Sequence, residues 1–382
     1  MKDIKILLYI YLVLSFFVGC SDVEFKSLPR CGGEADNCVE LMGFANYRYE
    51  VKMGSVDILI VNDNSGSMST EQSKMAQGFG NFEDTLNIKN IDYRLAVITT
   101  DISNSEDNAP KLANGNGLFQ DGQFLISSNG YDVLSPETPN VQNEFSDIIQ
   151  RQETLDCEAS GYKKDMCPSM YERGIYAANL ALDRLDTRLF RPKSNLLAIA
   201  IVSDEDENGK GTHFDDYDYA ETLVAKVGEK LGTDKMLGVY PIIIRPGDKD
   251  CKSIQDNQGN KQIYGQYGTE YARLVNSNSD FKSYGNLIDG YLGNICDSNY
   301  GDQLSVIAHD ISTESERPQL PCTPATKDSL PSDFPKADPL EIFVNGTKLD
   351  SSFYSVDGEN RVTFKPSLPA GTVPYFDVVC AR

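Results

Sequence analysis

Four side chains with metal-binding oxygens follow two apolar runs of this sequence. Asp63, Ser65 and Ser67 alternate at the end of "VDILIVNDNSGSM" (56–68), and Asp204 ends a second run, "LLAIAIVSD". Carboxylate and hydroxyl oxygens are hard ligands, which suit Mg²⁺, Mn²⁺ or Ca²⁺ better than a metal that prefers thiolates. The residue types and their spacing therefore predict a divalent metal site, with Mg²⁺ as the first choice.

The apolar pattern predicts the elements that position these residues. Four continuous apolar runs are typical of buried strands, and segments with helical spacing, such as "YERGIYAANLALDRL" (171–185), lie between them. We therefore predict a Rossmann-like α/β fold, with a mainly parallel sheet covered by helices on both faces. Ligands of such sheets bind beyond the carboxyl ends of the strands, where both Asp63 and Asp204 are expected to lie.

The charge of the predicted site indicates what it binds. Two serines stand where further carboxylates would otherwise neutralise the cation, so a bound divalent ion would keep an open position for an anionic oxygen from outside. We therefore expect a protein ligand that presents an acidic side chain. Two other classes stay open at this point: a structural or envelope-assembly protein whose metal only stabilises the fold, and a hydrolase that uses the metal to activate water.

The stretch "DNSGS" resembles the D-x-S-x-S motif of von Willebrand factor type A (VWA) domains, which form a metal-ion-dependent adhesion site. The resemblance covers roughly residues 53–313 and implies a Rossmann-like sheet with the motif after its first strand. It also implies that Ser65 and Ser67 coordinate the metal directly, and that Asp63 does so directly or through water. Asp204 matches the later aspartate of the family.

The sequence leaves the middle ligand of this motif open. The family carries a threonine just before a helix in the middle of the domain, whereas this sequence has "CPSMYERG" there. Ser169 stands at the comparable distance before Gly174 and is our first candidate for that metal ligand. Glu172 and Thr100 are the alternatives.

Other site chemistries fit the sequence less well. A helix cap requires one such residue and not three in alternation. A serine hydrolase would need His213 or His309, which are the only histidines, and the sequence lacks a G-x-S-x-G motif. The acids at 205–207 are more typical of a solvated loop than of a second cation site. We therefore expect a binding protein and not an enzyme.

The first twenty residues predict export and a lipid anchor. Lys2 and Lys5 precede an apolar run of about 13 residues, too short to span a bilayer, so residues 1–19 are predicted to be a signal peptide. "FVGC" resembles the lipobox of bacterial lipoproteins, in which the cysteine is lipidated. The resemblance implies that Cys20 anchors the mature protein in the cell envelope, and Ser21 after it favours the outer membrane.

Eight further cysteines indicate an oxidising compartment, since an even number suits four disulfides. Metal ligation by cysteine is disfavoured because no C-x-x-C pair occurs. Local spacing predicts the pairs Cys31–Cys38, Cys157–Cys167, Cys251–Cys296 and Cys322–Cys380.

Net charge and turn-forming residue pairs indicate the remaining partners and domains of the chain. The formal net charge of −22 argues against nucleic acid as a partner and against direct binding to an anionic membrane, so the lipid is the expected membrane contact. "NG" and "DG" pairs near the end predict hairpins. After the signal peptide we predict a tether with a disulfide loop (20–52), the VWA domain (53–313), a Pro-rich linker (314–340) and a small β domain (341–382).

Overall fold

The computed structural model describes residues 38–102, 120–161, 163, 167–168, 172–207, 216–232, 234–257, 265–275, 281 and 286–381. The predicted signal peptide and five residues singled out in the sequence lie outside these ranges, namely Cys20, Ser21, Cys31, Ser169 and His213.

The main domain is built on a parallel sheet. Its five strands follow the order β4 (Asp92–Thr99), β3 (Lys52–Asn62), β5 (Ser194–Ser203), β6 (Met236–Ile243) and β7 (Gly293–Asn294). Alternate residues of a strand are buried on opposite faces, with Ile58 and Ile60 on one face and Leu59 and Val61 on the other. Because both faces are covered, these strands are apolar throughout instead of alternating with polar residues.

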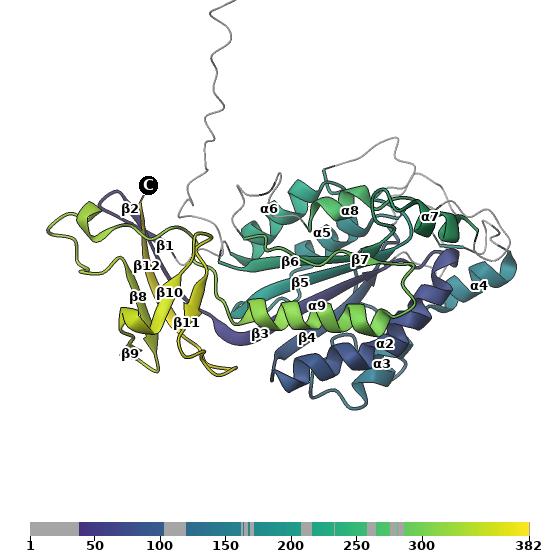
Figure 1. The fold of residues 1–382 in the computed structure, drawn as a ribbon, viewed down its shortest axis with the longest axis horizontal. Coiled ribbons are helices and arrows are strands. Elements are labelled where there is room, and N and C mark those ends of the chain that lie inside the picture. Colours follow the sequence, from purple (N-terminus) through teal and green to yellow (C-terminus); the bar gives the residue numbers. More distant parts are fainter. Residues whose placement is uncertain are drawn as a thin grey trace, which may run out of the picture.

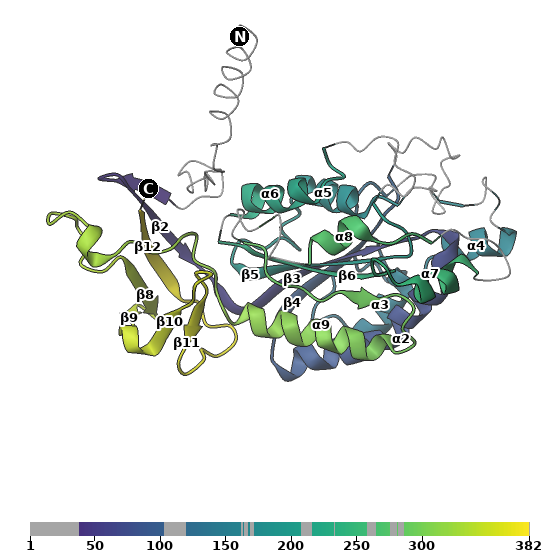
Figure 2. The same ribbon diagram turned by 45° about the horizontal axis from the view of Figure 1, so that its top comes forward.

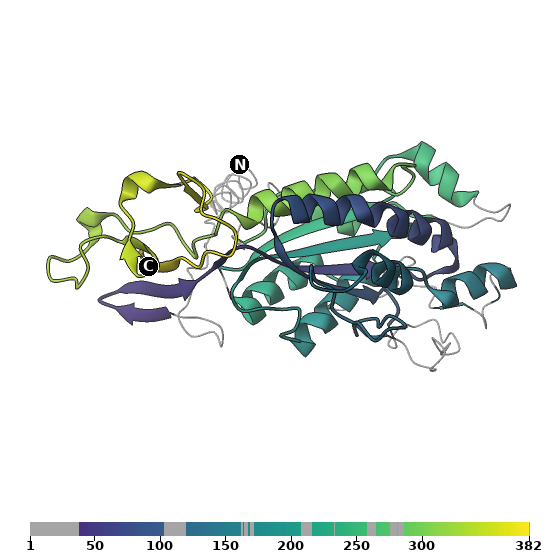
Figure 3. The same cartoon turned by 90° about the horizontal axis from the view of Figure 1, so that it is seen from below.

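Helices cover both faces of this sheet, so the predicted Rossmann-like α/β architecture is confirmed (Figure 1). One face carries α5 (Gly174–Arg184), α6 (Ala220–Leu231) and α8 (Thr269–Arg273) (Figure 2). The other carries α2 (Ser69–Ile88), α3 (Val141–Ile149) and α9 (Tyr300–Ser315), and α2 lies beside α9 (Figure 3). Three further helices are η1 (Gly66–Met68), α4 (Gln152–Ser160) and α7 (Lys249–Asp256).

A second, antiparallel sheet forms the small β domain. Its strand order is β1 (Cys38–Leu41), β2 (Phe44–Glu50), β12 (Tyr375–Ala381), β8 (Leu340–Val344) and β9 (Thr347–Lys348). The predicted "NG" hairpin joins β8 to β9, with Asn345 and Gly346 at positive φ. The "DG" hairpin joins β10 (Tyr354–Val356) to β11 (Val362–Phe364), and two short helices complete the domain, η5 (Lys327–Ser329) and η6 (Ser351–Phe353).

The first strands of this domain come from the segment predicted as a tether (20–52). Residues 38–50 instead form β1 and β2, and β2 pairs with β12 along its whole length. Ala45, Tyr47 and Tyr49 alternate into the core of the β domain, because β12 is a central strand that requires partners on both sides. The main domain is therefore inserted between two parts of the β domain.

The segment predicted as a linker (314–340) is packed instead of crossing solvent. Helix α9 continues to Ser315, and Leu320 and Phe334 beyond it are buried among residues of the β domain. The Cys322–Cys380 disulfide joins this segment to β12. Proline content alone therefore does not mark a linker here.

Three predicted disulfides are confirmed: Cys157–Cys167, Cys251–Cys296 and Cys322–Cys380. Cys38 is also disulfide-bonded, and its predicted partner Cys31 lies outside the described residues. These bridges fit a protein exported to an oxidising compartment. In the part of the chain that the structure describes, no helix has both the length and the apolar character needed to cross a membrane.

Candidate metal site

The carboxyl ends of β3 and β5 lie side by side and carry the two predicted aspartates. Asn62 and Val202 are opposite one another in the parallel pairing, and the Asp63 N–H donates to the Val202 carbonyl at 3.0 Å. Asp63 and Asp204 each follow the last residue of a strand, and both are fully buried. The parallel register therefore places the two carboxyl groups at the same edge of the sheet.

Ser65 and Ser67 connect these two carboxyl groups. Their hydroxyls lie 3.0 Å apart, and Ser67 Oγ donates to Asp204 Oδ1 at 3.2 Å. The backbone N–H of Ser65 donates to Asp63 Oδ1 at 2.8 Å. The four residues singled out by the motif thus form one connected cluster.

Ser203 belongs to this cluster, although the sequence analysis did not single it out. Its hydroxyl donates to Asp63 Oδ2 at 2.7 Å and accepts a hydrogen bond from the Glu205 N–H at 3.1 Å. This pair of contacts fixes the orientation of the Asp63 carboxyl group. The signal was a hydroxyl residue directly before a strand-terminal aspartate in "IVSDEDE".

Thr100 and Glu172, the two alternatives for the middle ligand, are brought together in the same region. The Thr100 hydroxyl donates to Glu172 Oε2, and both residues are buried. The Arg173 N–H donates to the Thr100 carbonyl at 3.4 Å, which ties the start of α5 to the end of β4. Glu172 also contacts the Asp63 carboxyl group. The first candidate for this ligand, Ser169, lies outside the described residues.

Burial and mutual repulsion dominate the electrostatics of the cluster. Burial raises the pKa of Asp63, and hydrogen bonds from Ser203 and Ser65 offset part of that rise. Burial also raises the pKa of Asp204 and of Glu172 well above their usual values, and the charge of Asp63 adds to both shifts. A cation placed among these carboxylates would relieve the repulsion and favour their ionised forms.

A layer of side chains beneath the cluster holds the loop after β3 in place. Gln72 Nε2 donates to the Asp63 carbonyl at 2.9 Å and to Thr154 Oγ1 at 3.1 Å. The Thr154 hydroxyl in turn donates to the Asn64 carbonyl at 2.7 Å. Because Thr154 lies on α4, this helix holds the loop after β3 in place. The Cys157–Cys167 disulfide in turn restrains α4.

The acidic run after Asp204 contacts the starts of two helices instead of forming the solvated loop that the sequence predicts. Glu207 is buried and accepts hydrogen bonds from two backbone N–H groups in the first turn of α5, those of Ile175 and Tyr176, at 2.8 and 3.0 Å. Asp206 accepts from the Glu270 N–H at the start of α8, at 2.9 Å. Two of the three acids therefore accept hydrogen bonds at helix N-termini. The first backbone N–H groups of a helix have no partner within the helix, so a carboxylate there is favourable.

The donor set of the cluster fits a hard divalent cation. Within the described part of the chain, Asp204 Oδ2 is buried without a hydrogen-bond partner, although buried carboxylate oxygens normally have one. No three His, Cys, Asp or Glu side chains among the described residues are grouped to hold a metal. The hydroxyls of Ser65 and Ser67 would therefore supply the ligands beyond the two aspartates, as oxygen-preferring cations allow.

The raised pKa values predict how pH affects the metal-free protein. Because Asp63, Asp204 and Glu172 hold protons more tightly when folded, the folded state binds more protons above about pH 4 than the unfolded chain does. The free energy of unfolding in chelator should therefore fall as pH rises above about 4, the ordinary pKa of these carboxyl groups. Calorimetric scans with saturating Mg²⁺ should show a shallower fall, and identical slopes would contradict this prediction.

The fold and the site together define an α/β protein with a carboxylate–hydroxyl cluster at the carboxyl edge of a parallel sheet. No family model matches the sequence, and no curated protein matches it. Among solved structures, the chain is similar to the pilus adhesin SpaC from Lactobacillus rhamnosus GG in its open conformation. The TM-score is 0.31 at 10% identity, over 90% of this chain and 42% of the adhesin.

Two further solved structures show likeness at the same level. Proximal thread matrix protein 1 from the mussel byssus has a TM-score of 0.30 at 11% identity, over 70% of this chain and 48% of its own. The human COPII-coat protein Sec24c has a TM-score of 0.30 at 9% identity, over 88% of this chain and 42% of its own. This chain spans less than half of each of the three, and at these scores none carries a functional argument.

Proposed function

We propose that this protein is a lipid-anchored component of the bacterial cell envelope whose main domain binds a protein ligand through a divalent metal. Asp63, Ser65, Ser67 and Asp204 would hold Mg²⁺, or Mn²⁺ or Ca²⁺ in its place. The cation would supply an open position for a carboxylate of the ligand. The motif's resemblance to VWA domains supports this proposal, and the parallel α/β fold agrees with it.

The observation that carries the proposal is Asp204 Oδ2, which has no hydrogen-bond partner among the described residues, in a carboxyl group that the Ser67 hydroxyl contacts. A buried carboxylate oxygen without a partner is costly, and a cation would satisfy it. Ser65 is partly exposed, whereas the two aspartates are fully buried. A ligand would therefore approach from the side of the serine hydroxyls, while the aspartates keep their fixed positions beneath.

The contacts of the neighbouring acids favour binding over hydrolysis. A hydrolytic mechanism would require a general base aimed at a metal-bound water. Glu205 is the nearest candidate in the sequence, and its Oε2 accepts a hydrogen bond from Gln266 Nε2 at 3.2 Å. Glu172 accepts from Thr100 and is buried, and its pKa is raised by burial and by Asp63. Both acids thus accept hydrogen bonds from neighbouring side chains and have roles other than that of a general base.

Millimolar Mg²⁺ should raise the melting temperature of the protein relative to the same protein in chelator. A ligand that binds only the folded state stabilises it by RT ln(1 + [L]/Kd), which is about 2.7 kcal/mol at a hundredfold excess over Kd. Calorimetry with Mg²⁺, Mn²⁺ and Ca²⁺ tests the site itself. A pull-down from envelope extracts, with Mg²⁺ in one arm and chelator in the other, tests the ligand. The absence of any shift with all three cations would rule out the proposed function.

The proposed lipid anchor predicts the chemistry of the mature N-terminus. Because Cys20 follows Gly19 at the end of the apolar run, the mature chain should begin with an acylated Cys20, detectable by mass spectrometry. Cys20→Ala should release the protein from membranes or stall its processing. An unmodified Cys20, or cleavage at another bond, would contradict the anchor without affecting the metal site.

A further inference from the structure

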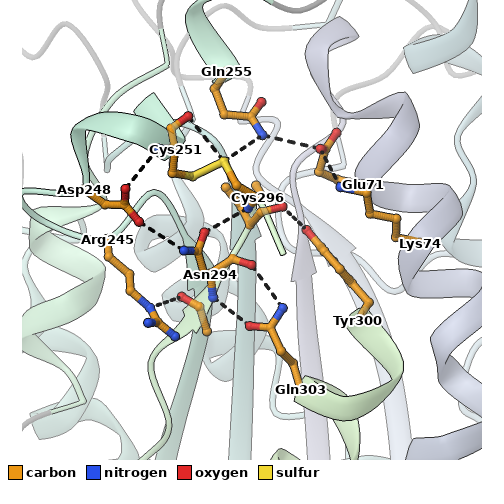
Figure 4. Close-up of a disulfide and its surroundings, with 12 residues drawn as sticks. Glu71, Lys74, Arg245, Asp248, Cys251, Gln255, Asn294, Cys296, Tyr300 and Gln303 are labelled. Atoms are coloured by element: carbon orange, nitrogen blue, oxygen red, sulfur yellow. Dashed lines mark hydrogen bonds and ion pairs between the residues drawn. A yellow bond between two sulfur atoms is a disulfide. The ribbon is translucent and has the colours of Figure 1, made fainter. Parts of the chain in front are cut away.

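A disulfide fixes helix α7 to the turn that precedes α9 (Figure 4). Cys251 lies in α7, and Cys296 lies between β7 and α9. Asp248 accepts hydrogen bonds from the Cys251 N–H and from Asn294 Nδ2, both at 3.0 Å. The Cys296 N–H donates to Asn294 Oδ1 at 2.9 Å. The bridge is therefore embedded in hydrogen bonds that hold α7 in one place.

Gln255 extends this link from α7 to the start of α2. Its Nε2 atom lies 3.4 Å from Glu71 Oε1 and 3.8 Å from Cys296 Sγ. Figure 4 draws both contacts. Gln255 and Glu71 are both buried, and Lys74 Nζ lies 3.5 Å from the same Glu71 oxygen. Gln255 thus helps to fix a buried carboxylate in the first turn of the helix that follows Ser67.

Both ends of this contact lie close to Asp204. The pKa of Asp204 is raised first by burial, then by the charges of Asp63 and Glu205, and also by the charge of Glu71. Gly265 lies between Gln255 and Asp204: a Cβ atom on Gly265 would be 2.9 Å from Gln255 Cβ and 3.5 Å from the Asp204 carbonyl. Gly265 is therefore packed against both residues, which places α7 beside the backbone of Asp204.

We propose that the Cys251–Cys296 disulfide, acting through Gln255, sets the cation affinity of the Asp63–Asp204 site by holding the Glu71 carboxylate near Asp204. This inference rests on the proposed metal-dependent function and identifies what determines the cation affinity of that same site. Gln255 is a positioning residue, because it acts through its contact with Glu71. Without the bridge, α7 keeps the Asp248–Asn294 hydrogen bond but loses its covalent attachment to the α9 turn, so Gln255 is held less firmly against Glu71.

The physical basis is the electrostatic potential that a fixed, buried carboxylate adds to a cation site. Such a charge is screened far less than one at the surface. Residues that orient the groups around a metal typically change its affinity by about 10- to 100-fold when they are replaced. We expect a loss near the lower end of that range, because Glu71 also pairs with Lys74 and stays nearby.

The test compares two disulfide variants of the otherwise oxidised protein. Cys251→Ser/Cys296→Ser should weaken Mg²⁺ binding about tenfold by isothermal titration calorimetry. Cys322→Ser/Cys380→Ser removes a bridge of the β domain and serves as the matched control. Both variants should melt at lower temperature, but only the first should bind Mg²⁺ more weakly.

A third variant separates positioning from folding. Gln255→Ala keeps the disulfide and should reproduce the roughly tenfold loss of Mg²⁺ affinity even if the double serine variant fails to fold. Gln150→Ala, which removes a glutamine that bonds Ser146 at the end of α3, should leave the affinity unchanged. Undiminished affinity in Gln255→Ala, or an equal loss in the β-domain variant, would overturn the inference. If the wild-type protein itself binds no cation, the proposed function fails first.

Discussion

Asp63→Ala should fold, lose the Mg²⁺-dependent rise in melting temperature, and lose binding of its protein ligand at the same time. Asp63 is fully buried, and its charge raises the pKa of both Asp204 and Glu172. Its removal therefore relieves repulsion in the metal-free protein. That gain offsets the loss of hydrogen bonds from Ser203 and Ser65, each of which contributes about 1 kcal/mol.

The measurement pairs calorimetry in Mg²⁺ and in chelator with a binding assay under both conditions. Asp84→Ala, an exposed aspartate on α2, is the matched control and should behave as wild type. Ser67→Ala should show a milder loss of Mg²⁺ affinity, because it removes a neutral oxygen and the contact at 3.2 Å to Asp204. Chelator-sensitive ligand binding that survives Asp63→Ala at full strength would refute the adhesion-site proposal.

The sequence was informative about the main domain because its strands carry a strong local signal. Strands buried on both faces are apolar throughout, so β3 and β5 stand out, and the polar residues after them mark the carboxyl edge of the sheet. The same logic predicts from the sequence that Asp63 and Asp204 lie close together. The pairing of nearby cysteines worked for a similar reason, since the separation of 10 between Cys157 and Cys167 leaves few alternatives.

The sequence was less informative where partners are distant along the chain. Strand β2 pairs with β12, more than three hundred residues later in the chain. No pattern in the sequence around β2 identifies such a distant partner. The alternation of Ala45, Tyr47 and Tyr49 in "FANYRYE" was the available sign of a half-buried strand. Glu207 likewise satisfies the N-terminus of α5, a contact that follows from the fold and not from the run of acids in which it occurs.

Asp57 is the residue whose importance the sequence conceals. It lies in the middle of the apolar run that forms β3, near the edge of the sheet opposite to Asp63, and it is fully buried. Its Oδ1 accepts from Arg191 Nε at 2.8 Å, and its Oδ2 accepts from Lys235 Nζ at 2.8 Å. Ser194 also donates to Oδ2. One carboxylate therefore balances two cationic side chains at the amino end of the sheet.

Asp57→Ala should lower the free energy of unfolding by about 3–5 kcal/mol, because it leaves a buried cation without its counter-charge. Burial lowers the pKa of Lys235, and Asp57 opposes that shift, so the variant's lysine should ionise even less readily. A lysine with a lowered folded-state pKa binds fewer protons than it does unfolded. The loss of unfolding free energy in Asp57→Ala, relative to wild type, should therefore become smaller as pH rises from about 7 toward about 10.

Urea unfolding of Asp57→Ala beside Asp63→Ala measures this contrast between the two edges of the parallel sheet. Asp57→Ala should lose stability equally in Mg²⁺ and in chelator, whereas Asp63→Ala should lose only the Mg²⁺-dependent part. In Asp57→Ala/Lys235→Met, part of the loss should return, because the uncompensated cation is gone while Arg191 keeps its contact at 2.8 Å with Asp92. A loss below about 1 kcal/mol in Asp57→Ala would show that the network around Asp57 contributes no more than a surface ion pair does.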